Sequence, residues 1–285
     1  MFGFFGVLLT IVGKYAIKKA NLDPMLLMSM RYVILFLCIL PILIYRRFSF
    51  LQNLSSLRLN IFKDVLLAVA ALIWYKSAVM IPINNAITVA FLNPVFVLII
   101  DAIIRKEMIP IPVLIGVFVS FVGICFVVGF DISAFNSSFY PYLLILLVSL
   151  LRSVSAIITS KVVCQQNLKD IFYSGITVQF LIATVVLLAN KSSLPNYLSM
   201  EGLFLISIIS ALFGLYYLCY LMAIKLTDLS WLQPFDFLRT VFSAIMSYII
   251  LGESLHFTSA VGSLLVIGGV WYAAKHGKKL VKNNN

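Results

Sequence analysis

Charged residues are scarce in this chain of 285 residues. Only 11% are Asp, Glu, Lys or Arg, whereas 62% are hydrophobic and the mean hydropathy is +1.09. A water-soluble protein with so few charges could not cover its surface with polar groups. The composition therefore excludes an ordinary soluble domain and indicates a protein that crosses the membrane several times.

Acidic residues are even scarcer than basic ones, with 10 of the former against 21 of the latter, so the formal net charge is +11. Such an excess is also found in nucleic-acid-binding proteins, but here the basic residues lie in short gaps between apolar runs. That distribution is typical of the charges that set membrane topology. We therefore expect the lipid bilayer, and no nucleic acid, as a partner.

Residues with catalytic chemistry are few as well. The two histidines, His256 and His276, lie outside the apolar runs, and the four cysteines form no CxxC pair. The sequence contains no HExxH, GxSxG or GxxxxGK[ST] motif. We accordingly expect no catalytic residues, no metal site and no cofactor, and no ATP-driven pumping encoded in this chain.

Ten apolar runs are long enough to be transmembrane helices, since a bilayer core of ~30 Å takes about 20 helical residues. The gaps between them are too short for a soluble domain. The predicted spans are Phe2–Ala20, Pro24–Tyr45, Ile61–Met80, Asn84–Ile104, Ile111–Phe130, Phe139–Val163, Asp170–Ala189, Glu201–Ile224, Leu229–Leu251 and Phe257–Ala274.

Lysines and arginines in the gaps predict that both termini are cytoplasmic, because cytoplasmic loops are enriched in these residues. With this orientation the larger set lies inside, and we expect a multi-pass protein of a bacterial inner membrane. The external residues are Lys14, Lys18, Lys19, Lys76 and Lys191, and the cytoplasmic ones are Arg46, Arg47, Arg58, Lys63, Arg105, Lys106, Lys161, Lys169, Lys225, Lys275, Lys278, Lys279 and Lys282.

An internal repeat is indicated by residues that recur at one constant spacing. Glu107, Gly116 and Gly123 return 146 positions later as Glu253, Gly262 and Gly269. This spacing divides the chain into halves at residues 1–135 and 136–285, with five predicted spans in each. Because five is odd, the second half enters the membrane from the opposite side, so the two repeats are predicted to be inverted.

The repeated segments resemble the EamA-type members of the drug/metabolite transporter superfamily. The resemblance is carried by residues 84–107, NNAITVAFLNPVFVLIIDAIIRKE, and by GVFVSFVGICFVV after them, and both patterns return in the second half. The chain departs from the family at Thr240, where the second copy commonly has proline. The resemblance implies a carrier of ten helices that works by alternating access through a central cavity.

A polar lane runs along the ninth predicted span. Asp236 and Ser243 share one stripe of this helix and Arg239 lies beside it. A charge at the bilayer centre costs roughly 2.5–3.5 kcal/mol, so such groups face a bundle interior or a water-filled cavity. We predict that these three residues bind substrate; a structural ion pair between Asp236 and Arg239 is the alternative.

Further polar and aromatic residues within other spans are candidates for the same cavity, although close helix packing or a membrane interface would also explain them. The serines near Arg152 are one such case. Proline-loosened helices are candidates for gates. The predicted binding residues are Arg152, Asn85, Asn93, Tyr216 and Tyr220, and the predicted gating residues are Pro94 and Pro234. Arg31, near an external helix end, is expected to extend outward to water.

These observations predict a secondary transporter of a small polar or amphipathic metabolite. A carboxylate facing a guanidinium suits an amino-acid-like zwitterion. The superfamily resemblance adds S-adenosylmethionine-like substrates. Coupling to protons or to a counter-substrate is compatible with the sequence. The alternatives are a flippase for lipids or lipid-linked sugars and, least favoured, an intramembrane enzyme.

Overall fold

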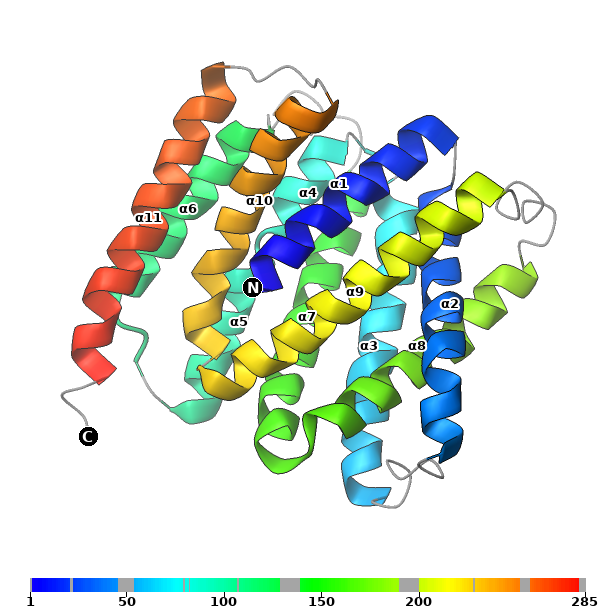
Figure 1. Cartoon of the computed structure of the whole chain (residues 1–285). Coiled ribbons are helices and arrows are strands. Elements are labelled where there is room, and N and C mark those ends of the chain that lie inside the picture. Colours follow the sequence, from blue (N-terminus) through cyan, green and yellow to red (C-terminus); the bar gives the residue numbers. More distant parts are fainter. Residues whose placement is uncertain are drawn as a thin grey trace. The chain divides into compact units, whose positions relative to one another are not determined.

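The structure is a computed structural model, and it describes residues 2–20, 23–45, 54–78, 80–81, 83–106, 108–128, 139–189, 200–227, 229–251 and 257–281. These residues form helices and turns, without a strand among them, which confirms the predicted all-α class. The helices are α1 (Phe2–Ala20), α2 (Pro24–Tyr45), α3 (Leu54–Ala78), α4 (Ile83–Ala90), α5 (Asn93–Arg105), α6 (Ile111–Val128), α7 (Tyr140–Gln165), α8 (Leu168–Ala189), α9 (Met200–Leu226), α10 (Leu229–Leu251) and α11 (Phe257–Val281) (Figure 1).

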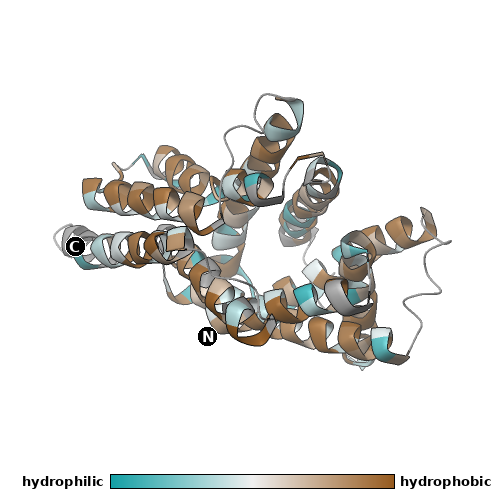
Figure 2. Ribbon diagram, turned by 90° about the horizontal axis from the view of Figure 1, so that it is seen from above, coloured by the Kyte–Doolittle hydropathy of each residue, from teal (hydrophilic) through white to brown (hydrophobic). Residues whose placement is uncertain are grey.

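Helix length and composition support a membrane-spanning protein. Five helical stretches in the described residues are long and apolar enough to cross a bilayer, and three shorter apolar helices accompany them. Most residues along the helices are hydrophobic (Figure 2). Large apolar side chains such as Phe118 and Leu264 are 68% and 71% exposed, as expected of surfaces that face lipid. The full count of ten spans remains a prediction. The five stretches are Pro24–Tyr45, Asn85–Ile104, Tyr140–Gln165, Leu168–Ala189 and Met200–Leu226.

The fourth predicted span, Asn84–Ile104, is two helices rather than one. α4 ends at Ala90, Phe91 and Leu92 form a turn, and α5 begins at Asn93 with Pro94 in its first turn. Proline has no N–H, so Pro94 cannot donate to the carbonyl of Ala90 four residues earlier. The chain tightens before it, and the Leu92 N–H donates to the carbonyl oxygen of Val89 at 3.1 Å.

The third helix is longer than the hydropathy pattern indicates. It begins at Leu54, about two turns before the predicted start at Ile61. Its first residues, LSSLRLN, are too polar to register as an apolar run, although none of them prevents a helix. As a result, Lys63 and Asp64 lie well inside a helix instead of near its end.

The helices group into two compact units, each with residues from both halves of the sequence. Unit 1 comprises residues 1–68 and 158–226, and unit 2 comprises residues 69–157 and 227–285. The boundary passes through α3 after Ala68 and through α7 after Ile157. These units differ from the predicted halves at residues 1–135 and 136–285, and that division stays a prediction.

In unit 1, α1 packs against α9, while α2 packs against α8 and α9 (Figure 1). An apolar core joins these helices. It consists of Ala16, Leu26, Leu27, Leu187, Leu205, Ile206 and Ile209, all nearly inaccessible to solvent.

In unit 2, α6 and α11 lie side by side along their length (Figure 1). Glycines make this close approach possible, because a Cβ atom on Gly116 would lie 2.5 Å from the carbonyl oxygen of Gly269. One on Gly123 would lie 2.7 Å from the carbonyl oxygen of Gly262. A lower residue number on α6 thus meets a higher one on α11, so the two helices run antiparallel.

The four glycines in contact form two pairs that are related by the repeat spacing of 146 residues. Gly262 is the repeat counterpart of Gly116, and Gly269 is the counterpart of Gly123. Each glycine of α6 therefore contacts the counterpart of the other one. At the centre, the Ser120 hydroxyl donates to the carbonyl oxygen of Val266, its own counterpart, at 3.4 Å. An exchange of partners of this kind is expected of two helices related by a local two-fold axis.

Candidate functional site

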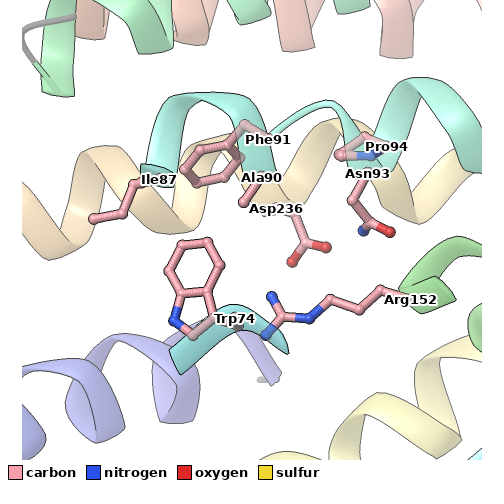
Figure 3. A pocket seen from close by; sticks show the side chains of 8 residues that line it. All are labelled: Trp74, Ile87, Ala90, Phe91, Asn93, Pro94, Arg152 and Asp236. Atoms are coloured by element: carbon pink, nitrogen blue, oxygen red, sulfur yellow. The ribbon is translucent and has the colours of Figure 1, made fainter. Parts of the chain in front are cut away.

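Unit 2 contains a pocket of about 200 Å³ in which charged, amide and aromatic side chains meet. Its walls come from α3, α4, α5, α7 and α10 and from the turn between α4 and α5. The lining residues are Trp74, Ile87, Ala90, Phe91, Asn93, Pro94, Arg152 and Asp236 (Figure 3).

Arg152 and Asp236 place opposite charges at this pocket. The two side chains extend from α7 and α10 toward the same space (Figure 3). The Arg152 guanidinium lies over the indole of Trp74, with its carbon 5.6 Å from the ring centroid. An aromatic face attracts a cation and holds its plane in place. The pocket thus presents an oriented guanidinium and a carboxylate, both half-buried.

Two serines of α7 contact the break between α4 and α5 through their hydroxyl groups. The Ser149 hydroxyl lies 3.3 Å from the carbonyl oxygen of Ala90, the acceptor that Pro94 cannot serve. Ser153 Oγ lies 2.8 Å from Asn93 Oδ1 and 3.1 Å from the Asn93 carbonyl oxygen. Each hydroxyl has one hydrogen to donate and also approaches a carbonyl of α7 itself. The serines near Arg152 therefore do more than allow close packing: Ser153 positions Asn93, and Ser149 contacts the end of α4.

Other predicted residues lie elsewhere in unit 2. Asn85, on α4, is fully buried, and its amide donates to the Tyr142 hydroxyl at 3.1 Å. Ser243 is half-buried on α10, two turns beyond Asp236, and does not line the pocket. Pro234 and Arg239 belong to α10, but their side chains lie outside the described residues. The expected ion pair between Asp236 and Arg239 therefore stays a prediction.

Tyr216 and Tyr220 belong to unit 1. Their rings stack along α9 with centroids 6.2 Å apart and planes 14° from parallel. Phe213 lies one turn before Tyr216, with 6.4 Å between the two centroids. These rings form a stripe on one face of α9, which agrees with their helical spacing.

Arg31 ends this stripe, and the structure contradicts its predicted orientation toward water. The side chain is only 5% exposed, and its guanidinium carbon lies 3.9 Å from the centroid of Phe213 and 4.7 Å from that of Tyr32. Nε has no hydrogen-bond partner. Sequence position alone suggested a short path outward, but two rings hold the cation inside.

The sequence analysis missed a buried ion pair in unit 1. The Lys63 ammonium donates to Asp64 Oδ1 at 2.7 Å, and the two residues are 0% and 1% exposed. Lys63 is among the charges predicted to be cytoplasmic; the structure shows it buried in an ion pair instead of exposed in a gap between helices, and its side of the membrane stays a prediction. The signal available in the sequence was an adjacent lysine and aspartate directly before the apolar run VLLAVAALIW.

No cluster of three or more His, Cys, Asp or Glu side chains that could hold a metal occurs within the described part of the chain. The arrangement at the pocket is suited to binding by charge and aromatic contact. A zwitterion or a polar headgroup would find complementary charges there.

Comparisons with known proteins identify the fold. The model of the EamA-like transporter family matches twice, at residues 1–129 and 139–274. Among curated proteins no match was found. Solved structures that match include one described only as the crystal structure of a protein, at 16% identity and a TM-score of 0.77. That alignment covers 98% of this chain and 97% of the other, and at such low identity it shows a shared fold alone.

Proposed function

Since this chain belongs to the EamA-like transporter family and so is a membrane transporter of small molecules, we propose that it is a secondary transporter of amino-acid-like zwitterions. Transport proceeds by alternating access and without ATP. The observation that carries the substrate class is the pairing of Arg152 with Asp236 at the pocket of unit 2.

The two charges have separate roles. The Arg152 guanidinium binds the substrate carboxylate through paired N–H donors, and its contact with Trp74 keeps the donor plane oriented. Asp236 binds the substrate ammonium. The Asn93 amide, positioned by Ser153, completes the polar wall. We retain Ser243, Arg239 and Asn85 as further substrate-binding residues on α10 and α4, and Tyr216 and Tyr220 as binding residues on the α9 stripe of unit 1.

Pocket size favours a compact substrate. Drug-sized ligands occupy pockets of roughly 300–1,000 Å³, whereas this one has about 200 Å³. An amino acid with a small side chain fits that volume. S-adenosylmethionine would place only its methionine end in the pocket, with the remainder outside. Trp74 and Phe91 offer apolar contact to the substrate side chain.

Alternating access requires two inverted repeats and a flexible element beside the site. The exchange of partners between α6 and α11 supports inverted repeats, since a two-fold axis parallel to the membrane relates antiparallel helices. The α4–α5 break at Pro94 supports a gate directly beside the substrate, and Pro234 on α10 is the second proposed gating residue. Proton or counter-substrate coupling drives the cycle. The protein resides in a bacterial inner membrane with both termini in the cytoplasm.

Proteoliposomes containing purified protein test this function. Labelled amino acids of increasing size, S-adenosylmethionine and a fluorescent phospholipid are each assayed for entry or transfer. We expect saturable uptake of one or more amino acids, lost in Arg152→Gln and retained in Ser207→Ala, which changes an exposed hydroxyl bonded only to its own helix. Phospholipid transfer without amino acid uptake would instead identify a flippase and refute the proposal.

A further inference from the structure

The buried Lys63–Asp64 ion pair of unit 1 leaves part of its hydrogen-bonding capacity unused. Only one carboxylate oxygen of Asp64 is used, because Oδ1 accepts from Lys63 while the buried Oδ2 has no hydrogen-bond partner. A buried charge whose lone pairs are not satisfied is costly, and a pair of this kind contributes little to stability. The arrangement therefore calls for a functional explanation.

Polar groups from two further helices surround this pair. The Gln179 amide of α8 donates to the backbone carbonyl oxygen of Asp64 at 3.0 Å. The Tyr217 hydroxyl of α9 lies 3.4 Å from the Lys63 ammonium, which gives the lysine a second acceptor. From α2, the Arg31 guanidinium lies over the ring of Phe213, and the Tyr32 ring meets that ring edge to face; Phe213 is on the same helix as Tyr217.

Gly175 brings α8 up to this group. A Cβ atom at that position would lie 2.9 Å from the Tyr217 hydroxyl oxygen and 3.5 Å from Asp64 Oδ1. The absence of a side chain thus lets three helices meet around one carboxylate. A change in the charge of Asp64 therefore affects its contact with Lys63 and the neighbouring groups from α8 and α9, Gln179 and Tyr217.

We propose that Asp64 binds the proton that couples transport to the proton gradient; this rests on the proposed function of secondary transport. One proton adds to Oδ2, so the pair changes from net neutral to a single positive charge. Lys63 keeps its own proton and directs its ammonium to the Tyr217 hydroxyl. Neutral Asp64 becomes a donor as well as an acceptor, and the attraction between Asp64 and Lys63 is lost.

A permanently ionised, purely structural pair makes the opposite prediction, and infrared spectroscopy separates the two. Purified wild-type protein carrying ¹³C-labelled aspartate is titrated with acid, and the carbonyl stretch of protonated aspartic acid is followed. The chain contains seven aspartates, and those exposed to water titrate as well, so variants are needed to identify the signal of Asp64. We expect one component of the titrating signal to be absent in Asp64→Asn, present in Asp101→Asn and replaced by an unlabelled band in Asp64→Glu. Asp101 is the matched control, because it is also buried, on α5 of unit 2.

This measurement needs no substrate, so its failure is distinct from a failure of the proposed function. Aspartic acid bands that titrate identically in wild type, Asp64→Asn and Asp64→Glu would overturn the proposal. Coupling is then tested by uptake of labelled alanine: we expect an inward proton gradient to stimulate uptake severalfold in wild type but not in Asp64→Asn, with alanine exchange retained. Wild-type uptake that ignores the gradient would also overturn it.

Discussion

Gly116 of α6 and Gly269 of α11 pack backbone against backbone, since a Cβ atom on either would lie within 2.6 Å of the other's carbonyl oxygen. Small residues allow such approach in membranes, where packing rather than water exclusion holds helices together. The contact belongs to the largest helix–helix interface of unit 2. It therefore links a sequence repeat to the stability of the protein.

Gly116→Ala should destabilise the protein by about 1–3 kcal/mol, the usual cost of overpacking. The matched control is Gly268→Ala, because a Cβ atom at Gly268 meets nothing within 4 Å. That control should be neutral, or slightly stabilising through the higher helix propensity of alanine. Unfolding in mixed micelles measures both. Equal stability of the two variants would contradict the packing argument.

Ser149→Ala should destabilise the protein by about 0.6–1 kcal/mol, the range for hydrogen bonds between membrane helices. The Ser149 hydroxyl lies 3.3 Å from the Ala90 carbonyl oxygen, which has no helical N–H donor because residue 94 is proline. In a Pro94→Ala background the helix supplies an N–H to that carbonyl, so the same serine substitution should cost less. A double-mutant cycle in unfolding free energy gives the coupling. Strictly additive effects would show that the hydroxyl and the proline act independently.

Arg152→Lys should weaken substrate binding about ten- to hundredfold, although it keeps the positive charge. Lysine lacks the planar fork that binds a carboxylate through two donors and stacks on Trp74, and a charge-assisted hydrogen bond is worth about 1.5–3 kcal/mol. The change should appear in the KM for uptake. Trp74→Phe, which keeps an aromatic face, should be milder. Full activity of Arg152→Lys would mean that only the charge matters.

A fluorescent reporter that folds only in the cytoplasm should be active when fused after Asn285, and alkaline phosphatase fused there should be inactive. The expectation follows from the excess of lysine and arginine in the gaps assigned to the cytoplasm. The majority is the same if Lys63, which is buried, is left out of the count. Phosphatase activity at this position would reverse the orientation.

Hydropathy was sufficient for the helices that are apolar throughout. The bounds of α1, α2, α10 and the start of α11 agree with the prediction because each apolar run ends in polar residues. Hydropathy did not predict the start of α3 or the break between α4 and α5, because neither depends on how apolar the residues are. The start of α3 is polar yet helical, and the fourth run is apolar yet broken, since a missing N–H leaves no trace in hydropathy.

The sequence by itself determined that this is a helical membrane protein with a repeated pattern, because composition and spacing depend only on the order of residues. It also placed Arg152, Asn93, Pro94 and Asp236 among the functional candidates. Only the tertiary structure brought these four to one pocket, and it assigned Tyr216 and Tyr220 to the other compact unit. It alone buried Arg31 between two rings and paired Lys63 with Asp64. Such contacts join helices far apart in the chain, and the energy of a charge depends on those neighbours, which no local pattern contains.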